Sequence, residues 1–132
     1  MNYEQGEIVL LRFPFSDLSS SKQRPALVLS PHSFNAAQED VITCLITSHI
    51  ESDSYGVIIQ PQDMENGFLP TKSRIKTYRI FTAKKEIITK KLGMLSYPKL
   101  NEAFEKIQKL LKPVKRQNAK FVGPIPLPTG FK

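Results

Sequence analysis

The apolar segments of this chain are short, and proline, glycine or polar residues interrupt each of them. The longest uninterrupted apolar runs, Ile8–Leu11 and Ala26–Leu29, hold four residues each. A helix that crosses a membrane needs about 20 apolar residues in a row. Short β-branched runs bounded by turn-forming residues are typical of strands. The sequence therefore excludes a membrane-spanning helix and predicts a mainly β chain.

Five segments fit this description of a strand. We expect strands over residues 7–13, 25–30, 41–48, 55–60 and 73–82. A serine-rich stretch separates the first two, and residues 32–40 form a polar connection with room for one helical turn. Asn66-Gly67 and Leu92-Gly93 are expected to be turns, because these residues tolerate unusual backbone angles. In 73–82, strict alternation would place Ile75 and Phe81 on one face and Tyr78 and Ile80 on the other.

One long helix is predicted near the C-terminus. Ser96 can cap it, and Pro98 is tolerated in its first turn. Its apolar positions recur at helical spacing, at Leu100, Phe104, Ile107 and Leu111, and Pro113 ends it. We therefore expect one α+β domain over residues 1–112, a small open barrel of about five to seven mostly antiparallel strands with a C-terminal helix. Residues 113–132 form a basic, proline-rich tail.

Charge is distributed unevenly along the chain. The formal net charge is +7, with −6 over residues 1–66, +8 over 67–111 and +5 over 112–132. No acid lies between Glu65 and Glu86, a gap that holds six lysines and arginines. Such a stretch can neutralise nucleic-acid phosphates, although a solvated face of a basic protein is the alternative.

Cysteine and histidine are too few for several kinds of site. Cys44 is the only cysteine, so no internal disulfide is possible, and its apolar surroundings favour a buried thiol. Two histidines and one cysteine give no recognisable metal-ligand spacing. The N-terminus lacks the basic-then-apolar order of a signal peptide. We expect a cytoplasmic protein without a metal, a cofactor or a membrane association.

Three ordered segments resemble the MazF/PemK family of toxin endoribonucleases. They are Gly6–Leu10 with Lys22–Pro31, the strand ending in Leu45–Ser48, and Ser73–Thr82 with Lys91–Leu95. Together they span residues 5–111. The resemblance implies an SH3-like barrel with an added helix and a homodimer. It also implies metal-independent cleavage of single-stranded RNA at short sequences, and neutralisation by a cognate acidic antitoxin.

Arg24 and Thr47 are the candidate catalytic residues. In metal-free RNA cleavage the substrate's 2′-hydroxyl attacks the adjacent phosphate, and the protein stabilises the crowded phosphorane. The fork of donors on Arg24 suits phosphate oxygens, and the resemblance places a catalytic hydroxyl at Thr47. Judged from their positions alone, without the family resemblance, Arg24 would be a solvated loop arginine and Thr47 an ordinary strand residue.

This assignment does not identify the residue that accepts the proton of the 2′-hydroxyl. Family members carry an acid either in the loop before the Arg-Pro pair or on the late basic strand, and this chain has neither. His49 shares the face of Thr47 and can act as an acid or a base, although a histidine after a strand end is commonly just exposed. His32 reads as a loop residue.

A second group of residues is expected to contact the RNA strand. These candidates are Lys22, Ser48, Ser73, Arg74 and Lys76. Phe15 and Tyr78 could stack on unpaired bases, with burial in the core as the alternative.

Two other functions are compatible with the same fold. One is a toxin that binds a protein target, as gyrase poisons do, and the other is a nucleic-acid-binding module without catalysis. The Arg24–Thr47 pair favours the ribonuclease, whereas the missing acids favour the module.

Overall fold

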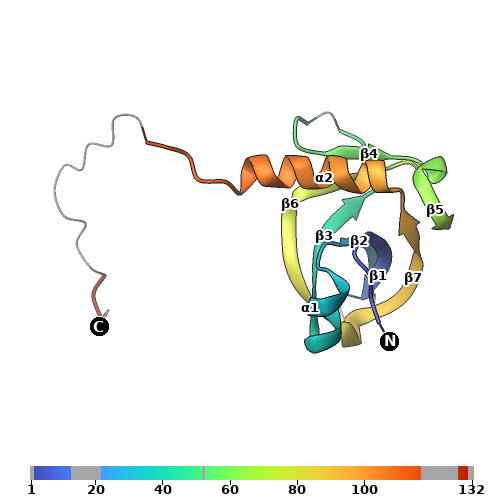
Figure 1. Ribbon diagram of the computed structural model, residues 1–132, viewed down its shortest axis with the longest axis horizontal. Helices are drawn as coiled ribbons and strands as arrows, with labels where there is room; N and C mark the ends of the chain where they lie inside the picture. Colours follow the sequence, from blue (N-terminus) through green and yellow to red (C-terminus); the bar gives the residue numbers. More distant parts are fainter. Residues whose placement is uncertain (1, 13–21, 52, 117–127, 131–132) are drawn as a thin grey trace.

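A seven-stranded antiparallel sheet curls into a half-barrel, and one long helix packs across it (Figure 1). The computed structural model describes residues 2–12, 22–51, 53–116 and 128–130. The strands are β1 (Glu7–Arg12), β2 (Gln23–Val28), β3 (Asp40–Thr47), β4 (Val57–Ile59), β5 (Met64–Gly67), β6 (Ser73–Lys84) and β7 (Ile88–Leu95). Their order in the sheet is β4-β6-β3-β2-β1-β7-β5. This architecture confirms the mainly β prediction.

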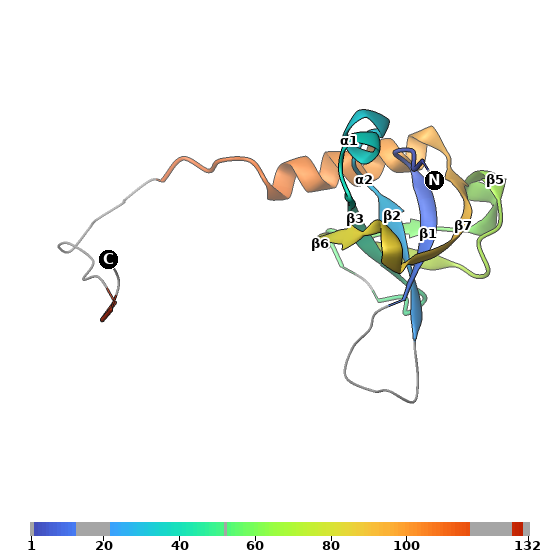
Figure 2. The same cartoon turned by 90° about the horizontal axis from the view of Figure 1, so that it is seen from below.

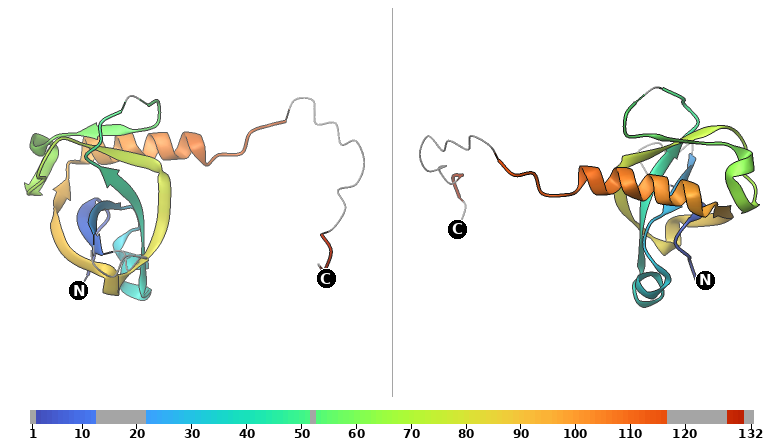
Figure 3. Two further views of the ribbon diagram at one scale, coloured as in Figure 1. Left: turned by 180° about the vertical axis from the view of Figure 1, so that it is seen from behind. Right: turned by 45° about the horizontal axis from the view of Figure 1, so that its top comes forward.

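The helices cover one end and one side of the half-barrel. Helix α1 (His32–Ala37) lies at the opposite end of the sheet from the start of β2 (Figure 2). Helix α2 (Tyr97–Leu110) contacts β4 and β6 and lies across one side of the curl (Figure 3). Short 3₁₀ turns η1 (Pro61–Asp63) and η2 (Lys85–Ile87) join the later strands. No helix among the described residues is long and apolar enough to cross a membrane.

Both faces of the central strands are buried, which explains their nearly continuous apolar sequences. The helix-side core lies between the sheet and α2. Its central members are Ile8, Leu27, Cys44, Ile46, Ile75, Leu100, Ala103 and Ile107. The second core, here called the curl-side core, lies on the other face of the sheet and contains Tyr3, Val9, Leu11, Ala26, Val28, Val41 and Ala83. Alternate residues of one strand therefore supply two different cores.

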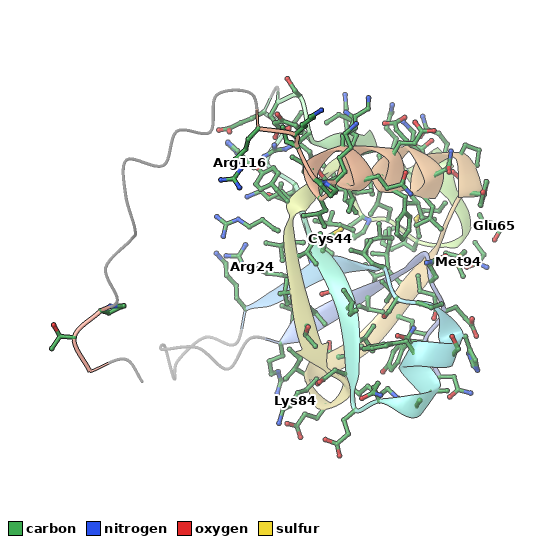
Figure 4. The ribbon with its side chains drawn as sticks, turned by 60° about the vertical axis from the view of Figure 1, so that its left-hand side comes forward. Arg24, Cys44, Glu65, Lys84, Met94 and Arg116 are labelled. Atoms are coloured by element: carbon green, nitrogen blue, oxygen red, sulfur yellow. The ribbon has the colours of Figure 1, made fainter. Side chains whose placement is uncertain are left out.

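Cys44 belongs to the helix-side core and lies between the sheet and α2 (Figure 4). Its thiol is fully buried, as the sequence predicts. Burial raises the pKa of the Cys44 thiol to about 12. Because the thiolate is the reactive form, this cysteine is a packing residue rather than a nucleophile.

Strand β6 contains a large bulge that overturns the expected alternation of its faces. Cys44 pairs with Ile80 and Ile46 with Ile75, so residues 76–79 of β6 stand opposite Leu45 alone. As a result Ile75 and Ile80 both pack in the helix-side core, although regular alternation would separate them. The prediction of two regular faces over 73–82 was wrong for this reason.

Two predicted turns are instead parts of strands. Gly67 ends β5 and pairs with Gly93 in the middle of β7. Gly67 does have a positive φ, of 81°. A side chain on Gly67 would overlap the carbonyl oxygen of Leu92, so glycine is needed for the close approach of these strands. The unusual backbone angle therefore serves a strand pair rather than a turn.

Candidate RNA-cleaving site

One end of the half-barrel brings together residues that are far apart in the sequence. Because β2, β3 and β6 are antiparallel neighbours, the start of β2, the end of β3 and the start of β6 meet there. Thr47 pairs with Arg74, and Ala26 pairs with Leu45. Continuing the second register by two residues places Arg24 opposite Thr47. Directly opposite residues share a face, so this extended register assigns Arg24 and Thr47 to the curl-side face, although the paired ladder itself ends at Ala26 and Leu45.

Arg24 is exposed at this edge and points away from the body of the protein (Figure 4). No acidic side chain pairs with it among the residues that the structure describes. The half-buried Pro25 and buried Ala26 hold the backbone that follows it. Arg24 is thus a guanidinium on a rigid strand whose donors remain available to a phosphate.

The Thr47 hydroxyl is half-buried at the end of β3. Its Oγ1 accepts a hydrogen bond from the backbone N–H of His49, at 3.1 Å. A hydroxyl can accept one bond and still donate its own proton. Thr47 therefore has a fixed oxygen and a donor left for a ligand.

His49 and Glu51 form a pair directly after Thr47. The distance from His49 Nε2 to Glu51 Oε1 is 2.8 Å, and both side chains are exposed. This hydrogen bond is the main reason that the pKa of Glu51 is lowered, and the positive charges of His49, Arg74 and Lys76 lower it further. The pair places a titratable ring beside the strand-end hydroxyl.

The other predicted RNA contacts divide into exposed and buried residues. Lys22 and Ser48 are exposed and Lys76 is half-buried. Ser73 and Arg74 are each only 4% exposed, and the Ser73 hydroxyl donates to the Thr71 carbonyl at 2.9 Å. The start of β6 lies beneath the β3–β4 loop, so these two residues are buried, and their predicted contact with RNA stays a prediction.

Arg74 is instead the anchor of that loop. Its Nη1 donates to Asp53 Oδ2, and Asp53 Oδ1 accepts the N–H groups of Tyr55 and Gly56. A Cβ on Gly56 would lie 2.8 Å from Arg74 Cδ, so the absence of a side chain lets the arginine pass. Arg74 Nε is buried without a partner among the described residues. Sequence reasoning missed Asp53, which is the second of two acids after Thr47 and follows Glu51 by two residues.

Two further bonds tie the same loop to the rest of the protein. The Thr77 hydroxyl donates to the Tyr55 carbonyl at 2.7 Å, and Lys106 Nζ of α2 donates to the Gly56 carbonyl at 2.9 Å. The loop that begins at Thr47 is therefore fixed at its far end by β6 and α2.

The structure describes only one of the two aromatic residues that were expected to stack on bases. Tyr78 is exposed, at 47%, on the bulge of β6. Phe15 lies outside the described residues. Lys22 immediately precedes β2, and the serine-rich stretch before it is likewise outside the described part of the chain.

Comparison with known proteins agrees with this architecture. Residues 4–111 match the model of the family described as PemK-like, MazF-like toxins of type II toxin–antitoxin systems. The match covers most of the chain, so the protein belongs to this toxin family. A search of curated proteins finds no significant match.

Solved structures of MazF toxins share the fold at low sequence identity. MazF from Deinococcus radiodurans is 22% identical with a TM-score of 0.67, over 84% of this chain and 97% of that one. A mycobacterial endoribonuclease in complex with its cognate antitoxin is 17% identical with a TM-score of 0.68, over 83% and 94%. A MazF toxin of Mycobacterium tuberculosis is 17% identical with a TM-score of 0.64, over 78% and 93%.

Proposed function

We propose that this toxin is a sequence-specific endoribonuclease that cleaves single-stranded RNA with Arg24 and Thr47. The observation that supports the proposal is the register of β2 and β3, which, extended by two residues, would set Arg24 opposite the strand-end hydroxyl of Thr47. Arg24 is exposed and pairs with no acid among the described residues. Family membership and the endoribonuclease among the similar structures support the same reading. Sequence and fold alone would also fit a toxin without catalysis.

In the proposed reaction the RNA supplies its own nucleophile. The 2′-hydroxyl oxygen attacks the adjacent phosphorus, its proton passes to a base, and the bond from phosphorus to the 5′-oxygen breaks as that oxygen is protonated. Arg24 stabilises the negative charge that builds up on the phosphorane oxygens, and the Thr47 hydroxyl donates a hydrogen bond to the same group. This route places no demand on a metal ion.

His49 is the proposed proton acceptor in place of the acids that family members carry. The Glu51 carboxylate can only accept hydrogen bonds, so His49 Nε2 bears the proton in the 2.8 Å bond between them. In the neutral ring this tautomer leaves a lone pair on His49 Nδ1 that can accept the proton. The backbone bond from His49 to Thr47 keeps this base near the hydroxyl.

The expected partners follow from the family. We infer a cytoplasmic toxin that acts as a homodimer and is neutralised by a cognate acidic antitoxin, as the mycobacterial endoribonuclease is seen in complex with its own antitoxin. The basic residues from Lys72 to Lys85, apart from the buried and ion-paired Arg74, supply positive charge for acidic partners of either kind.

Incubation of the pure protein with a long single-stranded RNA, with EDTA present, tests the proposal. We expect Arg24→Ala to reduce cleavage by a factor of at least about 100, because it removes a charged donor from the transition state. Thr47→Val keeps the shape and strand preference of the side chain and should lose activity to a similar degree. Lys109→Ala, on the exposed face of α2, is the control and should cleave normally.

The outcome separates the competing functions. Cleavage that survives in both Arg24→Ala and Thr47→Val would refute the assigned site. RNA binding by the wild-type protein without any cleavage would support the nucleic-acid-binding module instead. Growth arrest without RNA binding would point to a protein target.

A further inference from the structure

A cavity opens on the curl-side face next to the candidate site. It has a volume of about 300 Å³ and is lined by Leu45 and by four consecutive residues of β6, Tyr78–Phe81. Small-molecule sites begin at about this size. No acidic side chain is among its lining residues.

The bulge in β6 creates this cavity. In a regular strand, Tyr78 and Arg79 would point to opposite faces. Here four residues of β6 stand opposite Leu45 alone, and both Tyr78 and Arg79 are exposed. Bulges next to active sites re-aim side chains in this way. The distortion therefore presents an aromatic ring and a guanidinium together.

The cavity lies close to Thr47 along β3. Leu45 lies two residues before Thr47 on the same face of β3, which is a distance of about 7 Å along the strand. Its partner across the sheet is Ala26, two residues after Arg24. A nucleotide next to a phosphate bound at Arg24 and Thr47 would reach the cavity.

We propose that this cavity is a subsite for one unpaired nucleobase of the RNA, stacked on the ring of Tyr78. The inference rests on the RNA binding in the proposed function and adds a specificity element to it. Leu45 and Phe81 supply an apolar floor, and aromatic rings in single-strand binders stack on bases in such surroundings. Arg79 contacts the phosphate of the stacked nucleotide, because its donors suit phosphate oxygens.

Binding of strands that cannot be cleaved provides the test. The probes are fluorescein-labelled 12-nucleotide 2′-O-methyl RNAs of A, U and C, which lack the attacking hydroxyl. We expect Tyr78→Ala to weaken binding of the preferred probe about tenfold, with Tyr78→Phe close to wild type. Tyr97→Ala removes an even more exposed aromatic residue, on α2, and serves as the control.

Salt dependence distinguishes the two side chains. Stacking releases no counterions, so Tyr78→Ala should leave the slope of log Kd against log salt unchanged. Arg79→Ala should lower that slope by about 0.7, because one phosphate contact is lost. The chain has no tryptophan, so Tyr78→Trp introduces a single reporter whose fluorescence a stacked base should quench.

Three results would overturn the subsite. They are unchanged binding in Tyr78→Ala, an equal loss in Tyr78→Phe, or a change of oligomeric state in Tyr78→Ala, which would make this face a contact between copies. Stacking at Tyr78 in a protein that cleaves no RNA would refute the proposed catalysis and keep the subsite. Normal cleavage with unaltered base preference in Tyr78→Ala would refute the subsite and leave the proposed catalysis standing.

Discussion

Among single residues, those of the loop after β3 differ sharply in whether they can take part in chemistry. Thr47, His49 and Glu51 follow one another within five residues, and two hydrogen bonds connect them. Arg74, which is close in space, is withdrawn from this group by its ion pair with Asp53. Arg74 and Lys76 thus have different roles, although only one residue separates them. Arg74 lies under the loop, and Lys76 lies at the surface.

The pKa of Glu51 reports whether the pair with His49 exists in solution. Since His49 lowers the Glu51 pKa, the pair stabilises the fold above the ordinary carboxyl pKa, and this contribution is lost as the pH falls through the lowered value. We expect His49→Ala to raise the Glu51 pKa toward that of a free carboxyl. Carbon-detected NMR titration of the side-chain carboxyl measures it, and Glu65, exposed on β5, is the internal reference. An unmoved Glu51 would disprove the pair.

Among the secondary-structure elements, the close pairing of β5 with β7 depends on glycine. Gly67 has φ 81° and faces the Leu92 carbonyl, so a methyl group there has no space. We expect Gly67→Ala to lower the free energy of unfolding by about 1–3 kcal/mol, because the added methyl group overpacks the strand pair and alanine is strained at a positive φ. Urea denaturation measures this. Gly130 has a similar φ of 85° with nothing near its missing Cβ, so Gly130→Ala should cost less than about 1 kcal/mol. Equal losses would contradict the steric explanation.

The β3–β4 loop depends on the ion pair beneath it. Asp53→Asn removes the charge that compensates the buried Arg74 and turns an amide NH₂ group toward a donor. We expect a loss of about 3 kcal/mol in the free energy of unfolding, measured by urea denaturation. The control is Glu102→Gln, which breaks the more exposed pair with Lys99 and should cost less than about 1 kcal/mol. If Asp53→Asn and Glu102→Gln lowered the free energy of unfolding equally, the ion pair between Asp53 and Arg74 would be solvent-exposed rather than buried in solution.

Across the whole molecule, the helix-side core is closed before the tail begins. Leu100, Ala103 and Ile107 of α2 complete that core, and the described residues after Pro113 are all exposed. Figure 1 shows residues 113–116 leading away from the half-barrel. The division into a domain over residues 1–112 and a separate tail remains a prediction.

Truncation after Pro113 tests that division. We expect the melting temperature to change by less than about 5 °C, which is on the order of 1 kcal/mol for a domain of this size, and RNA cleavage to persist. Nonspecific RNA affinity should fall at low salt, since five positive charges lie in residues 112–132 and most are removed. A larger drop in melting temperature would show that the tail packs on the domain.

Most elements of this fold were predictable from local sequence signals. Strands over 7–13, 25–30 and 41–48 were predicted to within about two residues of β1, β2 and β3, because apolar β-branched runs bounded by proline carry a local signal. The helix predicted between Ser96 and Pro113 is α2, which begins at Tyr97 and ends at Leu110. Ser96 occupies the N-cap position, but its side chain makes no capping hydrogen bond, so that part of the prediction was wrong. The order of short motifs along the chain was enough to indicate the toxin family, and the family model confirms it.

Which residues meet, in contrast, depends on contacts between distant segments. The register of β2 on β3 pairs Ala26 with Leu45 and directs Arg24 toward the end of β3 that carries Thr47, and pairing across strands leaves no trace in either segment alone. The bulge of β6 exposes Tyr78 and Arg79 together, whereas alternation along the sequence predicts that they separate. Arg74 is buried because Asp53 and Gly56 come from another loop to cover it. Local propensity specifies the elements, and long-range packing assembles the site from them.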